Sequence, residues 1–244
     1  MALDRNIAVD IGNSFIKSGD FIKNELTKAE KWSSLIELRD SKDVNASWIF
    51  CSVRGNDHEI SEVFEGRSFH ILTYRSQLPV EINYKTPETL GMDRVAATIG
   101  AQVLFPNQNV LVIDMGTCIT YDLLDAKGVF QGGIISPGIK MRMMAMHHFT
   151  KGLPDISNEW EELEIQKLGK STKECLSKGS VEAVAHEIDG FISSLREEFY
   201  DLVVLLTGGD AVNFESKLKQ PIFARSNLVL VGLNEILKSQ QWEE

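Results

Sequence analysis

The sequence predicts an α/β fold with mixed sheets flanked by helices, arranged as two similar halves. Short apolar runs bounded by turn residues alternate with amphipathic stretches of helical spacing. One unit occurs twice: an apolar run, an Asp, one apolar residue, a Gly and then small polar residues. The copies are Ile7 to Gly12 and Leu111 to Gly116, and each precedes a second short apolar run. This repeat predicts two lobes, and the cleft between two such lobes suits a nucleotide.

The 244 residues can form one large domain or two smaller ones. We expect a hinge at 107–109, which gives an N-terminal lobe of 1–108 and a C-terminal lobe of 109–244. The net charge of −10 argues against a nucleic-acid partner, and no apolar run approaches the roughly 20 residues of a membrane span. Three cysteines without CxxC spacing predict reduced thiols in a cytoplasmic protein.

In the first half, three short runs bounded by polar turns predict strands at 7–9, 48–53 and 69–73. Thr86 and Pro87 predict a helix start, with Thr86 as the cap and Pro87 in the first turn. One face of that helix carries apolar residues four positions apart, Val95, Ile99 and Val103. The helix ends before the next proline.

In the second half, strand-like runs occur at 110–113, 119–124, 134–135, 202–206 and 228–231. A methionine-rich helix is expected between them, with Met141, Met144, Ala145 and His148 on one face. Ser171 and Glu174 fit a capping box that opens a long helix. Its buried stripe comprises Val184, Ile188, Phe191, Leu195 and Phe199. A terminal helix begins near Leu233.

The first Asp-x-Gly turn has the residues of a phosphate-binding loop. Gly12 permits a tight turn and a close approach of backbone N–H groups to phosphate oxygens. Asp10, at the end of the strand, suits a divalent cation that bridges those phosphates. A single such turn also ends many ordinary hairpins. Two copies, together with the Gly208-Gly209 turn after a late strand, favour nucleotide binding, although a Gly-Gly turn also joins ordinary strands to helices.

Gly91 to Arg94 places a carboxylate beside a guanidinium in an expected first helical turn. A helix N-terminus favours an ionised Asp93, which suits a carboxylate that accepts a hydroxyl proton. Arg94 suits an anionic substrate or a phosphate. The alternative interpretation is a solvated ion pair at a helix start.

Two further patterns have simpler explanations. The run 169–171, Gly-Lys-Ser, ends like a Walker phosphate loop but lacks its earlier glycine, so Ser171 is better explained as a helix cap. His147 and His148 are adjacent and diverge on a helix, so they do not form an i, i+4 ligand pair. The methionine face is interpreted as core or subunit contact.

The ordered set of motifs resembles type III pantothenate kinases, members of the acetate and sugar kinase/Hsp70/actin superfamily, over nearly the whole chain. The segments that carry the resemblance are Asp10-Ile11-Gly12-Asn13-Ser14, Asn83-Tyr84-Lys85, Gly91-Met92-Asp93-Arg94, Asp114-Met115-Gly116-Thr117, 132–138, Thr172, Gly179 and Thr207-Gly208-Gly209. The resemblance implies two actin-like (ribonuclease H-like) lobes and ATP-dependent phosphorylation of pantothenate to 4′-phosphopantothenate, the first step towards coenzyme A. It also implies a homodimer with the substrate pocket near the subunit interface, magnesium, and a monovalent cation, potassium or ammonium.

The resemblance further implies roles for individual residues. Asp93 would be the catalytic base, Asp10 would lie near the magnesium ion, and Asp114 would coordinate the monovalent cation. ATP would be bound by Asp10, Ile11, Gly12, Asn13, Ser14, Phe15, Ile16, Lys17, Thr117, Gly208 and Gly209. Pantothenate would be bound by Tyr84, Gly91, Met92, Asp93, Arg94 and Thr172.

The chain departs from the family pattern at Ser14, Met92, Cys118, Lys140 and Arg142. Three other functions remain as alternatives: another small-molecule kinase of the superfamily, a non-catalytic transcriptional accessory protein on the same fold, and an actin- or Hsp70-like ATPase. An accessory protein predicts loss of Asp10, Asp93 or Asp114, and all three are present. An ATPase gives the segment from Gly91 to Arg94 no role.

Overall fold

The computed structural model describes residues 5–43, 45–162 and 167–240. The chain forms two compact units. Within the described residues, unit 1 contains the chain up to Val112, Asp122–Gly132 and the chain from Arg225, whereas unit 2 contains Ile113–Tyr121 and Gly133–Ala224. The lobe boundary between 108 and 109 stays a prediction.

Unit 1 contains a mixed five-stranded sheet in the order β3-β2-β1-β4-β5. Its strands are β1 (Arg5–Ile11), β2 (Ile16–Ile22), β3 (Glu25–Trp32), β4 (Ser47–Ser52) and β5 (Phe69–Ile71). The pairs β1–β2 and β2–β3 are antiparallel, and the pairs β1–β4 and β4–β5 are parallel. Strand β1 is central, so its carboxyl end lies between the paired strands β2 and β4.

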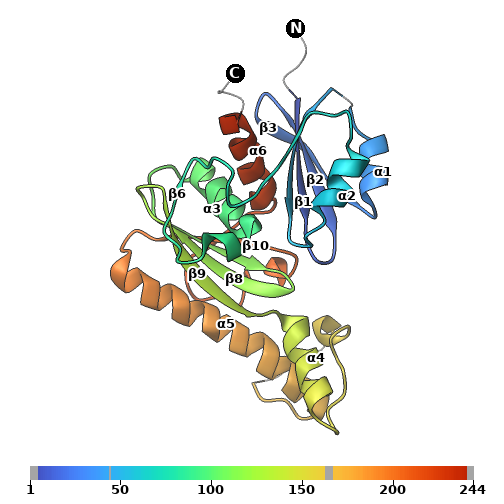
Figure 1. Cartoon of the computed structure of the whole chain (residues 1–244). Helices are drawn as coiled ribbons and strands as arrows, with labels where there is room; N and C mark the ends of the chain where they lie inside the picture. The colour runs from blue at the N-terminus through green and yellow to red at the C-terminus, as the bar shows by residue number, and fades with distance from the viewer. Residues whose placement is uncertain (1–4, 44, 163–166, 241–244) are drawn as a thin grey trace. The chain divides into compact units, whose positions relative to one another are not determined.

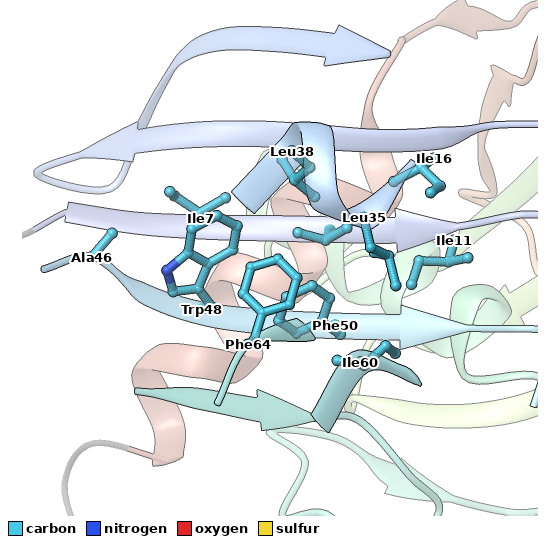
Figure 2. Packing of buried hydrophobic residues seen from close by; sticks show 11 residues of the cluster. Ile7, Ile11, Ile16, Leu35, Leu38, Ala46, Trp48, Phe50, Ile60 and Phe64 are labelled. Atoms are coloured by element: carbon cyan, nitrogen blue, oxygen red, sulfur yellow. The ribbon is translucent and has the colours of Figure 1, made fainter. Parts of the chain in front are cut away.

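Helices α1 (Leu35–Asp40) and α2 (Asp57–Val63) cover one face of this sheet, and α6 (Leu228–Gln240) packs on the other (Figure 1). Figure 2 shows the apolar core beneath α1 and α2. The ring of Phe64 lies 4.8 Å from that of Trp48 and 4.7 Å from that of Phe50, measured between centroids. Burying a large apolar side chain contributes about 1.5–3 kcal/mol, so this core holds β1 and β4 firmly together.

Helix α3 (Met92–Leu104) packs against α6 through two glycines. A Cβ atom on Gly100 would lie 2.1 Å from the carbonyl oxygen of Leu228. A Cβ atom on Gly232 would lie 1.7 Å from the carbonyl oxygen of Ala96. Only glycine fits at either position, and the two helix backbones therefore meet directly.

The strand expected at 228–231 is wrong, because these residues form the first turn of α6. Leu228, Leu233, Ile236 and Leu237 are buried at helical spacing. A short apolar run is ambiguous between a strand and a buried helix. The contact of Gly232 with α3 decides in favour of the helix.

The helix start expected at Thr86 is confirmed only for a short 3-10 turn and not for the long helix that follows. Residues Pro87–Thr89 form one 3-10 turn, η1, and Thr86 makes no side-chain capping bond to it. Helix α3 begins at Met92 with Gly91 as its N-cap, because Leu90 is extended and interrupts the helical backbone. On the predicted apolar face Val95 and Ile99 are buried, but Val103 is 47% exposed.

The second sheet has six strands in the order β11-β10-β7-β8-β9-β6. They are β6 (Glu81–Ile82), β7 (Val110–Met115), β8 (Cys118–Leu124), β9 (Val129–Pro137), β10 (Val203–Thr207) and β11 (Phe223–Ala224). Strands β7, β8 and β9 contribute residues to both units. The runs expected at 110–113, 119–124, 134–135 and 202–206 all overlap strands of this sheet.

Unit 2 also contains α4 (Ile139–Phe149), η2 (Trp160–Glu162), α5 (Thr172–Glu198) and η3 (Ala211–Asn213). The cap of α5 is confirmed, since Ser171 Oγ accepts the N–H of Glu174 at 3.3 Å. The predicted stripe of α5 is buried at Val184 and Ile188. Within the described parts of the chain, no helix has the length and apolar character needed to cross a membrane.

Candidate active site

The first Asp-x-Gly turn joins β1 to β2 in unit 1. The N–H of Gly12 donates to the carbonyl oxygen of Phe15 at 3.1 Å and closes the turn. Arg54, just after β4, donates from Nε to the carbonyl oxygen of Gly12 at 2.8 Å and from Nη2 to that of Asn13 at 3.2 Å. Asn13 and Ser14 are exposed. The turn is therefore fixed from one side and open to a ligand.

The other residues of this loop anchor it or flank it. Ile11 and Ile16 are buried and pair across β1 and β2, and the next pair is Asp10 with Lys17. Paired residues on neighbouring strands share one face of the sheet, so an ammonium group and a carboxylate lie side by side at the start of the loop. The ring of Phe15, which is 54% exposed, lies beneath the ammonium of Lys31.

Asp93 lies in the first turn of α3 and is half-buried. Its Oδ1 accepts the backbone N–H of Arg94 at 2.9 Å. Burial raises the pKa of Asp93 above that of an ordinary aspartate, and the Arg94 N–H opposes this effect. A Cβ atom on Gly91 would lie 2.6 Å from Asp93 Oδ1, so the glycine leaves room for the carboxylate in this position.

Asp10 and Asp93 both lie in unit 1, near β4. Cys51 of β4 pairs with Asp10 across β1 and β4 and is fully buried. Helix α3, which carries Asp93, packs against β4. Burial raises the pKa of the Cys51 thiol, and the charges of Asp93, Asp10 and Asp57 raise it further. The packing of α3 on β4 therefore places the candidate base beside the sheet whose strand β1 leads into the first phosphate loop.

Arg94 is buried. Its side chain therefore does not form a solvated ion pair with Asp93, which was the alternative interpretation of the sequence. Its Nε and Nη2 donate to Asp122 Oδ1 at 2.9 and 2.6 Å. Tyr84 lies close enough to the guanidinium to contribute, after Asp122, to the raised pKa of Arg94. The ring of Tyr84 lies 6.3 Å from that of Phe130, between centroids. Two predicted substrate residues, Arg94 and Tyr84, are therefore close together.

The second Asp-x-Gly turn joins β7 to β8 and lies in unit 2. The N–H of Gly116 donates to the carbonyl oxygen of Cys118 at 3.0 Å. The N–H of Asp210, which follows the Gly-Gly turn, donates to the carbonyl oxygen of Met115 at 3.1 Å. Asp114 is half-buried, and Thr117 is exposed.

Glycines from two other segments pack against this second turn. Gly138 donates its N–H to the carbonyl oxygen of Thr117 at 3.1 Å, and a Cβ atom there would lie 2.5 Å from the same oxygen. Gly208 has a φ of +97°, and its Cβ atom would lie 2.4 Å from the oxygen of Met115 and 2.6 Å from Asp114 Oδ1. The fold thus brings Asp114, Thr117 and Gly208 together, with no room for a side chain at either glycine.

The remaining predicted residues lie in different surroundings. Met92 is buried at the start of α3. Gly209 is exposed, and a Cβ atom there would meet nothing within 4 Å. Thr172 is exposed as the first residue of α5, beside its cap.

Asp10 and Asp114 are the two carboxylates expected at cations. Among the described residues, no three His, Cys, Asp or Glu side chains gather as a metal cluster. Magnesium in kinases is typically held by one or two carboxylates together with substrate phosphates. The carboxylate of Asp10 at the mouth of an exposed loop fits such a shared site.

Sequence interpretation missed three polar residues of these neighbourhoods: Arg54, Asp122 and Asp210. Arg54 and Asp122 lie 42 and 28 positions from their partners, so no local pattern reveals them. Asp210 directly follows the Gly-Gly turn, so the sequence could have indicated it. Burial raises the pKa of Asp210, and the charge of Lys140 opposes that shift.

Comparison with known proteins identifies the family. The type III pantothenate kinase family matches residues 6–194. A type III pantothenate kinase of Cytophaga hutchinsonii is 40% identical over 233 residues, which cover 95% of this chain and 98% of that protein. One of Phocaeicola vulgatus is 40% identical over 238 residues, which cover 95% of this chain and 97% of that protein.

Solved structures show the same fold at low sequence identity. A putative 2-dehydro-3-deoxygalactonokinase from Sinorhizobium meliloti has a TM-score of 0.58 at 13% identity, covering 98% of this chain and 97% of its own. The ethanolamine utilization protein EutJ from Carboxydothermus hydrogenoformans has a TM-score of 0.55 at 14% identity, covering 97% and 91%. These likenesses confirm the predicted actin-like α/β fold with mixed sheets flanked by helices. The sequence matches confirm the resemblance, and this chain belongs to the type III pantothenate kinase family.

Proposed function

We propose that this chain transfers the γ-phosphoryl group of ATP to the primary hydroxyl of pantothenate and forms 4′-phosphopantothenate, the first step towards coenzyme A. As a kinase, the enzyme uses ATP and a divalent metal ion. The observation that carries the proposal is the half-buried carboxylate of Asp93 in the first turn of α3, which packs against β4 in unit 1.

Asp93 acts as the general base. As the pantothenate hydroxyl oxygen bonds to the γ-phosphorus and the bond to the ADP oxygen breaks, the hydroxyl proton passes to Asp93. Burial raises the pKa of this carboxyl, which makes it a better proton acceptor than a solvated aspartate. Such assistance contributes about 10²–10⁴-fold. Alignment and charge neutralisation supply most of the remaining rate enhancement, because phosphoryl transfer requires little covalent chemistry from the protein.

The first loop, from Asp10 to Lys17, holds the phosphates of ATP, and Asp10 would hold the magnesium ion, which would supply positive charge for the transferred phosphoryl group. Its exposed turn at Asn13 and Ser14, held by Arg54, supports this role. Lys17, beside Asp10 in the sheet register, supplies positive charge.

The second loop holds a monovalent cation, potassium or ammonium, at Asp114. Thr117 contacts ATP, and Gly208 and Gly209 contact its adenosine. The exposed Thr117 and the close approach of Gly208 to Asp114 support these assignments.

Pantothenate is bound by Tyr84, Gly91, Met92 and Arg94, and by Thr172 on the first turn of α5. The proximity of Tyr84 to Arg94, whose pKa it helps to raise, supports a common role for those two residues. Arg94 supplies the positive charge that a carboxylate substrate requires.

The enzyme is a homodimer in this proposal. Three apolar side chains of β9 and α4 are exposed: Ile135 by 61%, Met144 by 54% and Phe149 by 82%. Exposed large apolar side chains such as these are candidates for burial in a subunit interface. The nearby charge of Arg142 is paired with Glu187 at 2.7 Å.

Sedimentation of the wild type should give twice the mass of one chain. Met144→Glu should shift the protein towards monomer, and a wild-type monomer would exclude the dimer. We expect this dimer in the cytoplasm, since its three cysteines are free thiols.

A coupled assay for ADP tests the activity, with pantothenate, a panel of sugars, and acetate as acceptors. We expect turnover with pantothenate only, and a faster rate in potassium than in sodium at fixed magnesium. Turnover with a sugar instead would support the alternative kinase. Equal rates in sodium and potassium would exclude the monovalent cation site.

A further inference from the structure

Asp122 forms a buried ion pair that lies entirely within unit 1. Asp122, on β8, is 1% exposed, and Arg94, on α3, is 8% exposed. Burying two charges costs several kcal/mol of solvation, and apolar residues of similar size often stabilise a fold equally well. Stability alone therefore does not explain why the fold contains this pair.

The pair fixes the orientation of the guanidinium. Nε and Nη2 lie on one edge of the guanidinium plane, and both donate to Asp122 Oδ1. Two bonds from one edge restrain the rotation of the plane, and N–H donors on the other side stay available for a second anion. A lysine would not be restrained in this way.

The Arg94 side chain pairs with Asp122 and not with the neighbouring base. Asp93 Oδ1 accepts the backbone N–H of Arg94, while the Arg94 side chain is directed to Asp122. The charge of Arg94 lowers the pKa of Asp93, but burial of that carboxyl has the larger effect. Asp93 therefore keeps a raised pKa beside the buried pair.

Tyr84 is brought to the same guanidinium by strand pairing. Strand β6 pairs with β9, with Ile82 opposite Phe130, and the N–H of Asn83 donates to the carbonyl oxygen of Phe130 at 3.0 Å. Tyr84 follows directly, and it lies close enough to Arg94 to contribute to the raised pKa of the guanidinium. The two bonds to Asp122 therefore set the orientation of Arg94, and Tyr84 lies nearby.

We propose that Asp122 is a positioning residue that orients Arg94 towards the carboxylate of pantothenate and thereby sets the preference of the enzyme for an anionic acceptor. This inference rests on the proposed function, which makes pantothenate the substrate and Arg94 one of its ligands. Asp122 itself touches neither the substrate nor the reacting atoms.

The test compares the KM for pantothenate with the competitive Ki of its uncharged N-methyl amide. Asp122→Asn should raise the KM for pantothenate about tenfold and leave the Ki of the amide, kcat and the KM for ATP near wild type. A merely structural role of Asp122 would not produce this loss of charge preference, because a structural defect would weaken the binding of pantothenate and of the amide together. Asp122→Glu keeps the charge but displaces it by one methylene, and should lose part of the same preference.

Asp20→Asn is the matched control, because Asp20 pairs with the largely buried Lys42 at 2.7 Å near the amino end of β1. Asp20→Asn should lower the stability of the fold without changing the preference for pantothenate over its uncharged amide. Arg94→Gln separates the two proposals. If Arg94→Gln retains the preference, the assignment of Arg94 to the substrate fails. If Arg94→Gln loses it but both Asp122 variants retain or increase it, the inference about Asp122 alone is overturned.

Discussion

The loop after β1 and the loop after β7 share the Asp-x-Gly pattern, but their surroundings differ. The first is exposed at Asn13 and Ser14, and the long side chain of Arg54 holds its carbonyl groups. The second is packed against Gly138 and Gly208, where a single added methyl group would overlap backbone oxygens. One local motif thus forms an exposed loop held by Arg54 in unit 1 and a tightly packed loop in unit 2.

The packing difference predicts a large difference in stability. Gly208→Ala should destabilise the fold by about 3–5 kcal/mol, because its φ is positive and its Cβ would overlap Met115. Gly12→Ala should cost no more than about 1 kcal/mol, since the nearest atom to its Cβ would be 3.6 Å away. Scanning calorimetry should show a melting temperature lower by roughly 10 °C for Gly208→Ala. Equal melting temperatures of the two variants would contradict the comparison.

The two carboxylates should respond to different cations. Asp10→Asn should raise the magnesium concentration needed for half-maximal rate by about tenfold or more, because a charged ligand is lost. Asp114→Asn should abolish the stimulation by potassium and leave the magnesium dependence near wild type. Initial rates in a matrix of magnesium and potassium concentrations measure both effects. If the two variants shift the same ion dependence, the loops do not divide the cations as proposed.

Among these changes to the two loops, the replacement of Arg54 should have the smallest effect. Arg54→Ala removes two charged hydrogen bonds from the first loop, so the KM for ATP should rise about 3–10-fold, which corresponds to about 0.6–1.4 kcal/mol in total. The KM for pantothenate at saturating ATP should stay near wild type. Arg39→Ala is the control, since Arg39 pairs with Asp40 on α1. An unchanged KM for ATP in Arg54→Ala would show that the first loop holds its shape without this side chain.

The parts of the site that could be predicted from the sequence depend on local chemistry. Both Asp-x-Gly turns follow strands, Asp93 lies in a first helical turn, and Ser171 caps α5. In each case the residue type, its turn or cap geometry and the adjacent apolar run indicate the same structure. The type III pantothenate kinase family was identified from the order of these motifs.

The parts that could not be predicted depend on distant contacts. The run 228–231 is apolar enough for a strand, and only the contact between Gly232 and Ala96 shows that it is helical. Arg94 could be singled out from the sequence, but its partner Asp122 lies on a strand of the second sheet. Thr86 has the composition of a cap but no cap bond, because the helix begins after the extended Leu90.

The pH dependence of kcat/KM for pantothenate, compared between the wild type and Asp93→Asn, tests the central claim that Asp93 is the base. Because burial raises the pKa of Asp93, the wild-type rate should fall with decreasing pH at values above the ordinary aspartate pKa of about 3.9, as protonation removes the acceptor. Asp93→Asn should lose about 10²–10⁴-fold in kcat/KM and show no such acidic limb, while ATP binding by calorimetry is retained. Near-normal turnover in Asp93→Asn, or the same acidic limb, would contradict the assignment.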